Sequence, residues 1–437
     1  MTKFMLLDPL GFGLEMEGGK PGWNDAMNGL CALFGSGMPE MYELLRLLNF
    51  CHSLFDKYSA RSVDIPTEVD WLIADAVSCL NAYDEDGDDF KFWNDLSAAR
   101  DRYRDATKLY VLQHTVKWSL KNLKDVFANM IKKVETGTIK ALEFNGGKLA
   151  PSYFIFDVTD YSLLGTYDQD GRENVKVLGF SPRSVPFFLE GPTRQLKTLK
   201  SIEERRRVYD EVKKSDLYDT ALQMYKISGS LESMDLEIGR MVAFAPGWLE
   251  NESIWLHMSY KYYLELLRGG LFAEYYDSIK TGVVAFMDPV TYGRSPLECS
   301  SFIVSSAYPD KTAHGQGYLA RLSGSTAEFL SMWNTMMAGP KPFKFDESVL
   351  TLELKPALVS WLFDETGDLQ FTFIGSVEVT YHNPSKLDTW SSQVSKTLLT
   401  DKGGDILEIS GGVIPAPYAS DVRSLKYVSI EMFFGEL

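Results

Sequence analysis

The stretch from Thr291 to Trp333 combines many hydroxyls, glycines and single charges with few long aliphatic side chains. Near its end, Ser325-Thr326-Ala327-Glu328 leads into an apolar run, which is typical of a helix start. Ser323 and Ser325 would then lie where the first backbone N–H groups of a helix have no internal partner. Such a place favours an anion, because the free donors and the helix dipole both attract negative charge. The side chains nearby in the sequence that could add charge or donors are Arg294, His314, Gln316 and Arg321. The alternative is that the hydroxyls only cap the helix and form turns.

Two further stretches, 18–29 and 246–260, are rich in polar and aromatic residues and weakly periodic. In the first, Asp25 follows a Gly-rich turn and Trp23. It could serve as a general acid if burial beside the indole raised its pKa; the alternative is an N-cap. In the second, Glu250 or Glu252 could hold sugar hydroxyls and His257 could bind an anion. Capping and packing are again the alternatives.

The composition limits the classes of partner. The chain has 437 residues, a formal net charge of −16 and a hydrophobic fraction of 45%. Its length predicts two domains, and its charge argues against nucleic acid or an anionic membrane as a partner. No metal-binding, P-loop or GxSxG pattern is present, so we expect no cofactor. The cysteines show no CxxC spacing, and the N-terminus does not resemble a secretory signal, so we expect free thiols in the cytoplasm.

The elements that must position these residues follow from periodicity. Apolar residues recur at helical spacing from Pro39 and again from Pro66, and we expect further helices over 90–112, 116–134, 201–226 and 254–267. Segment 138–200 reads as short strands and loops, with a turn at Asp168–Gly171 and coil over 180–192. The acidic run 84–89 reads as a solvated turn. After Pro340 the period changes to two, which predicts a β-sandwich.

Together, GKPGWNDAMNGL (19–30), GWLENESIWLHMSYKY (247–262) and the stretch 291–333 resemble the C-terminal part of the inverting glycoside phosphorylases of the cellobiose-phosphorylase type. The long relatives that act on β-1,3-glucan look most similar. The resemblance implies an α+β chain with a partial (α/α)6 barrel over 1–342, with an insertion near 138–200, followed by a C-terminal β-sandwich over 343–437. It implies a β-gluco-oligosaccharide and inorganic phosphate as substrates.

The resemblance also assigns roles to residues. Asp25 corresponds to the general acid, which protonates the departing oxygen while phosphate attacks the anomeric carbon. His257, Ser323, Ser325 and Gln316 correspond to phosphate-binding positions. The sugar-binding candidates are Trp23, Asn24, Glu250 and Arg321.

The chain also departs from the family. Gly22 stands where simple cellobiose phosphorylases carry an Asp, and Ser323 and Ser325 stand where they carry threonines. The family's N-terminal sandwich and early barrel helices do not precede Met1, which predicts a fragment, one half of a split enzyme or a chain that needs a covering partner, such as a second copy. Two other functions remain open: an inverting hydrolase that pairs Asp25 with Glu250 or Glu252, and a noncatalytic carbohydrate-binding or assembly module.

Overall fold

The chain is mixed α+β, with 43% helix, 26% strand and several sheets. The computed structural model describes residues 1–15, 27, 34–320, 324–346 and 348–435. The α+β class is therefore confirmed, whereas the (α/α)6 barrel stays a prediction. Contacts divide the chain into two units, Met1–Tyr262 with Val284–Arg321 and Tyr263–Val283 with Leu322–Leu437. The boundary that we predict between residues 342 and 343 also stays a prediction.

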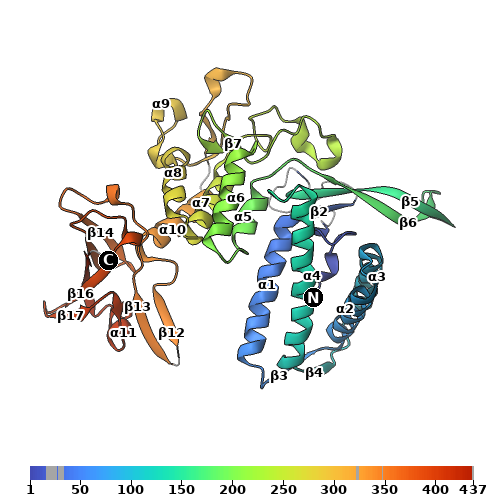
Figure 1. The fold of residues 1–437 in the computed structure, drawn as a ribbon, viewed down its shortest axis with the longest axis horizontal. Helices are drawn as coiled ribbons and strands as arrows, with labels where there is room; N and C mark the ends of the chain where they lie inside the picture. The colour runs from blue at the N-terminus through green and yellow to red at the C-terminus, as the bar shows by residue number, and fades with distance from the viewer. Residues whose placement is uncertain (16–26, 28–33, 321–323, 347, 436–437) are drawn as a thin grey trace. The chain divides into compact units, whose positions relative to one another are not determined.

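The first unit contains most of the helices (Figure 1). Its helices are α1 (Met38–Lys57), α2 (Thr67–Asp86), α3 (Asp89–Thr107), α4 (Leu120–Phe144), α5 (Glu190–Leu196), α6 (Ile202–Lys214) and α9 (Pro289–Tyr292), and α7 (Leu256–Arg268) begins in it. Its strands are β1 (Leu14–Glu15), β2 (Gly35–Gly37), β3 (Ser62–Pro66), β4 (Thr115–Ser119), β5 (Tyr153–Tyr167), β6 (Glu173–Ser184), β7 (Tyr218–Asp219), β8 (Met224–Tyr225), β9 (Ile254–Trp255), β10 (Ser300–Ile303) and β11 (Gly317–Ala320). They form sheets in the orders β1-β2-β5-β6, β11-β10-β9, β3-β4 and β7-β8.

The four helices α1, α2, α3 and α4 share one apolar core with the N-terminal loop, residues 4–14. The face of α1 that repeats at helical spacing supplies the buried Met41, Leu44, Leu45 and Leu48, as its periodicity predicts. Gly137 of α4 lies against this loop so closely that a Cβ there would come 1.9 Å from the Gly11 carbonyl oxygen. The helix therefore needs glycine at this point despite its cost to helix propensity.

Several predicted boundaries are wrong. Helix α4 continues ten residues beyond the predicted end at 134, because its Thr- and Gly-rich second half is held by packing against the N-terminal loop. Helix α6 ends at Lys214 rather than near 226, where the chain turns into the short β7–β8 pair. Helix α3 ends at Thr107, and the predicted coil over 180–192 contains the end of β6 and the start of α5.

The acidic run is only partly the solvated turn that we predict. Helix α2 extends to Asp86, Gly87 takes a left-handed conformation, and Asp88 caps α3 by accepting from the Lys91 N–H at 2.9 Å. Asp89 is only partly solvated, and it pairs with Lys133 at 2.8 Å and with Lys140 at 2.5 Å.

A long antiparallel hairpin, β5–β6, extends from the first unit (Figure 1). Its tip is the predicted turn, in which the Asp168 N–H donates to the Arg172 carbonyl and Gly171 has a φ of 78°. The predicted strands and turn are therefore confirmed, but the strands have 15 and 12 residues rather than being short, and the ends of segment 138–200 include parts of α4 and all of α5.

Within its described residues, the second unit combines three helices and the end of α7 with two sheets. Its complete helices are α8 (Phe272–Gly282), α10 (Gly324–Ala338) and α11 (Tyr418–Arg423). Its strands are β12 (Phe343–Asp346), β13 (Val349–Glu353), β14 (Asp368–Phe373), β15 (Val377–His382), β16 (Gln393–Asp401), β17 (Ile406–Ser410), β18 (Val413–Ile414) and β19 (Tyr427–Gly435). The strand orders are β12-β13-β18 and β14-β15-β19-β16-β17.

The alternating segments of the second unit are strands, as their period predicts. Val377, Val379 and Tyr381 of β15 are fully buried, and they pair with β19, whose Ile430 and Met432 are buried too. The Tyr381 hydroxyl donates to the Met337 carbonyl at 2.6 Å, which ties this sheet to α10. In the part of the chain that the structure describes, no helix is long and apolar enough to cross a membrane.

Candidate functional site

The sheet β9-β10-β11 joins two of the three stretches selected from the sequence. Strand β9 comes from 247–262, and β10 and β11 come from 291–333. The register pairs Trp255 with Phe302 and Phe302 with Tyr318, so residues far apart in the sequence lie side by side. The glycine that makes this possible is Gly317, where a Cβ would come 2.3 Å from both the Tyr292 ring and the Ser300 hydroxyl.

An aromatic ladder follows this register across one face of the sheet. The rings of Trp255 and Phe302 stack at 5.9 Å with an interplanar angle of 11°, and those of Phe302 and Tyr318 stack at 5.9 Å. Trp248 packs on Phe302, Tyr308 and Tyr318, with ring centroids 4.7 to 5.6 Å apart. Phe302 is buried, but the four other rings are only half-buried. Partly exposed aromatic rings can stack against the apolar face of a sugar.

The turn beside this ladder has an unusual backbone. Gly247, Leu249 and Glu252 have φ angles of 79°, 50° and 57°. Left-handed conformations at non-glycine residues cost energy and persist where the surroundings hold them. Here Trp248 and Asn251 bond to each other through their backbones, and the Asn251 amide donates to the Phe244 carbonyl at 2.8 Å. Asn251 Oδ1 is buried and has no hydrogen-bond partner among the described residues, which is uncommon for a buried acceptor.

The two carboxylates of this turn differ in their surroundings. Glu250 and Glu252 are both buried. Glu252 is held by the buried Lys226 in an ion pair of 2.7 Å, and its backbone N–H donates to the Ser228 hydroxyl at 3.1 Å. Burial raises the pKa of the nearby Asp216 above its ordinary value, although the Lys226 charge opposes the shift. Glu252 is therefore engaged in a structural ion pair with Lys226.

Sequence reasoning missed this ionic cluster. Lys226 is a single charge between the apolar Met224-Tyr225 and Ile227, and a lone charge in such a run predicts a buried ion pair. It also missed Asp219, a buried carboxylate that accepts from the Ser306 N–H at 2.7 Å and from the Ser306 hydroxyl at 2.9 Å. Asp219 thereby fixes the loop between β10 and β11.

Of the first stretch, Trp23, Asn24 and Asp25 lie outside the described residues. Met27 is described and fully buried, in a core cluster with Tyr153 and Phe188. The Phe188 backbone pairs with Ser228, whose hydroxyl accepts from the Glu252 N–H. The contacts that connect Met27 to the turn at 247–252 are therefore one core cluster, one backbone bridge and one hydrogen bond.

The predicted phosphate-binding residues lie in different parts of the structure. His257 is half-buried in the first turn of α7, directly after β9. Gln316 directly precedes β11 at the other end of the three-stranded sheet, where its amide donates to the Thr312 carbonyl at 2.9 Å and accepts from the Tyr318 hydroxyl at 3.0 Å. The Gln316 amide nitrogen carries a second hydrogen, which a phosphate could accept without displacing either partner.

The helix start that we predict near Ser325 is confirmed, since α10 begins at Gly324 and Ser325 is buried in its first turn. Ser325 belongs to the second unit, whereas His257 and Gln316 belong to the first. Ser323 and Arg321 lie outside the described residues. The two other donors near this stretch have partners: His314 Nε2 contacts the Tyr308 carbonyl at 2.7 Å, and Arg294 donates to the Gly317 carbonyl at 2.7 Å.

Comparison with known proteins adds no assignment. No protein-family model matches the chain, and no curated protein has a significantly similar sequence.

Proposed function

We propose that the chain is an inverting glycoside phosphorylase, or the C-terminal part of one. In this proposal its helices belong to an (α/α)6 barrel, its C-terminal sheets form a β-sandwich, and it acts in the cytoplasm. The reaction splits a β-glucan or β-gluco-oligosaccharide with inorganic phosphate. It gives α-glucose 1-phosphate and an oligosaccharide shorter by one residue.

The proposed step needs one acid and one anion site. A phosphate oxygen attacks the anomeric carbon as the glycosidic C–O bond breaks, and Asp25 transfers its proton to the departing oxygen. His257, Ser323, Ser325 and Gln316 hold the phosphate in this proposal. Glu250 binds the sugar with Trp23, Asn24 and Arg321. Because phosphate is already an anion, no second carboxylate is needed to activate a nucleophile.

The observation that carries the proposal is the aromatic ladder beside the strained turn at 247–252. Half-buried rings, the buried Glu250 carboxylate and the unpartnered Asn251 Oδ1 provide the apolar surface and hydrogen-bond acceptors that a glucosyl unit requires. Cys51 and Cys79 are free thiols, as expected of a chain in a reducing compartment.

Phosphate release from glucose 1-phosphate with β-gluco-oligosaccharide acceptors tests the proposal. The chain is assayed alone and together with the product of any adjacent upstream reading frame. We expect Asp25→Asn to abolish both synthesis and phosphorolysis, because the amide cannot donate the required proton. We expect His257→Ala to raise the KM for phosphate with a smaller effect on the KM for the acceptor. Asp170→Asn, at the exposed tip of the β5–β6 hairpin, is the matched control and should retain full activity.

Three outcomes would contradict the proposal. An Asp25→Asn variant with more than about a tenth of the parent rate would remove Asp25 from the acid role. Release of free glucose without a phosphate requirement would indicate the inverting hydrolase. Glucan binding with no phosphate-dependent turnover, alone or with the second polypeptide, would indicate the noncatalytic module.

A further inference from the structure

The outer half of the β5–β6 hairpin carries an apolar face (Figure 1). Tyr161 pairs with Val177, and Leu163 pairs with Val175 across the two strands. Directly opposed residues of an antiparallel pair have their side chains on the same side of the ladder, and so do residues two apart along one strand. These four side chains therefore share one face of the hairpin.

The residues of this half alternate as they do in strands with one buried face. Ser162 and Lys176 pair with each other between the apolar positions, so they lie on the opposite face. Such alternation normally places the apolar side chains against a core. Here the apolar side is open instead, since Tyr161 is 58% exposed, Leu163 60% and Val175 50%. The pattern therefore indicates a face that another molecule covers.

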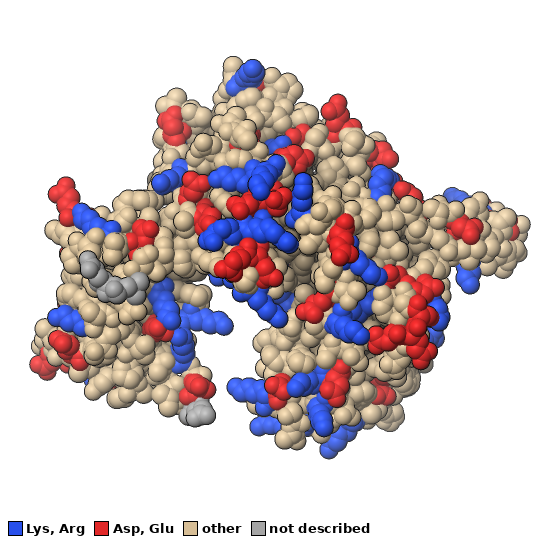
Figure 2. All heavy atoms as spheres, in the orientation of Figure 1, with Lys and Arg blue, Asp and Glu red and all other residues tan. Residues whose placement is uncertain are grey.

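Tyr167 extends this face toward the tip of the hairpin. It is 64% exposed, and it pairs with Glu173, which lies two residues from Val175 on β6. The Glu173 carboxylate accepts from the Gly165 N–H at 3.1 Å. The face therefore carries one charged group, and that group is bonded within the hairpin. Figure 2 shows that uncharged side chains make up most of the visible side of the hairpin.

The edges of the hairpin are less suited to association than its face. Strand β6 is the last strand of its sheet, and β2 pairs with β5 only over residues 153–155, so no further described strand lies beside the outer half. The β5–β6 ladder is irregular between Val158 and Tyr161 and again between Leu163 and Tyr167. Bulges twist an edge and disfavour the addition of another strand. We therefore expect a partner to pack on the face.

We propose that this face, formed by Tyr161, Leu163, Tyr167, Val175 and Val177, packs against the same face of a second copy of the chain. The exposed fractions of its four most exposed residues correspond to about 450 Å² of mainly apolar surface per copy, or about 900 Å² for two copies. Because somewhat more than half of a typical interface is apolar, the whole contact would bury about 1,500 Å². This area is sufficient for a specific dimer.

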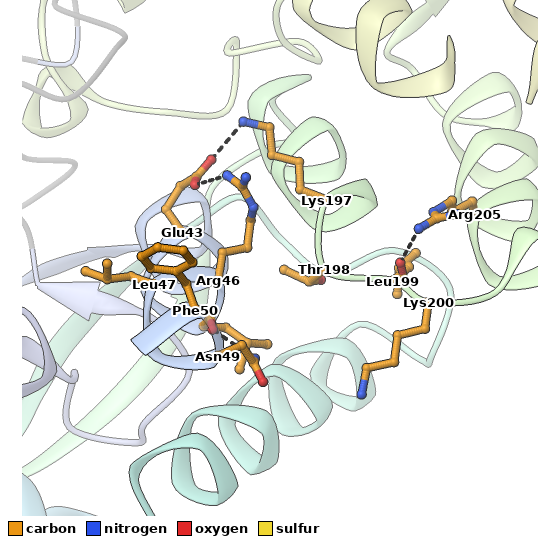
Figure 3. A pocket seen from close by; sticks show the side chains of 11 residues that line it. Glu43, Arg46, Leu47, Asn49, Phe50, Lys197, Thr198, Leu199, Lys200 and Arg205 are labelled. Atoms are coloured by element: carbon orange, nitrogen blue, oxygen red, sulfur yellow. Dashed lines mark hydrogen bonds and ion pairs between the residues drawn. The ribbon is translucent and has the colours of Figure 1, made fainter. Parts of the chain in front are cut away.

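The charges also favour a second copy as the partner. In a symmetric contact both copies use the same surface, so a charged face would bring like charges together. The hairpin face avoids this cost. The groove beside α1 does not: Leu47 and Phe50 are more than half exposed there, but they lie beside Arg46, Lys197 and Lys200 (Figure 3). The dimer contact involves none of the proposed catalytic or binding residues and does not depend on the proposed function.

Sedimentation velocity of the purified full chain over a range of concentrations tests the dimer. We expect a reversible equilibrium between monomer and dimer. Leu163→Ser should raise the dimer dissociation constant at least about a hundred-fold, because a symmetric contact loses the apolar side chain twice. Val175→Thr keeps the branched shape and the strand preference, and it should raise the constant at least about ten-fold, because two hydroxyls would lose water.

Two matched variants control for exposure and position. Lys176→Gln changes the opposite face of the same strand, and Phe50→Ala removes an equally exposed apolar side chain from α1. Both should keep the dissociation constant of the parent. Because all four substituted positions are exposed, every variant should also keep the far-UV circular dichroism spectrum of the parent.

A parent chain that stays monomeric at about 0.1 mM would overturn the proposal, since the face would then be covered by a different molecule or by none. Equal dissociation constants for the parent, Leu163→Ser and Val175→Thr would place any dimer contact elsewhere. A loss of association in Lys176→Gln as large as that in Leu163→Ser would exclude the apolar face as the contact.

Discussion

Glu40 provides a test of the buried electrostatics of the first unit. It lies in the first turn of α1, is half-buried, and has one buried carboxylate oxygen with no hydrogen-bond partner among the described residues. Burial, with the negative charge of Glu190 as the next cause, raises the pKa of Glu40 to about 7 from 4.5. Glu190, in contrast, accepts hydrogen bonds from both Arg194 and the Tyr153 hydroxyl.

The sign of the effect follows from where the proton is held. Between pH 4.5 and about 7 the folded chain keeps the Glu40 proton and the unfolded chain has released it. The free energy of unfolding therefore falls as pH rises through this window, and the loss is complete above it. A shift of this size corresponds to about 3 kcal/mol at roughly 1.4 kcal/mol per pKa unit. Asp8, whose pKa burial raises to about 6 from 3.8, acts in the same direction but at lower pH.

Glu40→Gln should remove the contribution of Glu40 to the pH dependence of the unfolding free energy, because the Gln side chain has the same shape as Glu and carries no charge. Between pH 5 and pH 8, the free energy of unfolding should fall by about 3 kcal/mol less in the variant than in the parent. The variant should therefore be the more stable of the two proteins at pH 8. Urea unfolding followed by tryptophan fluorescence at pH 5, 6.5 and 8 measures this difference. Glu135→Gln, at an exposed position of α4, is the control and should follow the parent curve. Equal pH slopes for the parent and Glu40→Gln between pH 6 and 8 would refute the reasoning, since Asp8 contributes equally to both proteins.

Two further perturbations test the turn at 247–252. Lys226→Ala should lower the free energy of unfolding, measured by urea denaturation, by about 3–5 kcal/mol, because it leaves the buried Glu252 carboxylate without its cation. The same substitution in a Glu252→Gln background should lower it much less. An equal loss in the two backgrounds would exclude the ion pair as the cause. Gly247→Ala should destabilise the chain by more than about 1 kcal/mol, since φ is 79° and a Cβ would come 2.6 Å from the Tyr308 backbone nitrogen. It should also weaken oligosaccharide binding in a titration, and a variant that matches the parent in both measurements would show that the turn tolerates a side chain.

Much of the secondary structure could be predicted from the sequence, because periodicity depends on which face of an element is buried. The apolar residues of α1 recur at helical spacing and face the core, and the alternating residues of β14, β15 and β19 belong to strands. Element ends were less predictable. Helix α4 passes through Gly137 because the N-terminal loop packs on it, and that contact is not visible in the local sequence.

The candidate site shows the same division. The sequence by itself selected 246–260 and 291–333 by their unusual density of polar and aromatic residues, and it selected Glu250 and His257 within the first of them. Only the tertiary structure showed that β9, β10 and β11 pair and that Trp255, Phe302 and Tyr318 stack across them. It alone also showed that Lys226 forms an ion pair with Glu252. The physical reason is that residue type and spacing fix local preferences, whereas strand register, ring stacking and ion pairing depend on segments that are distant in the chain.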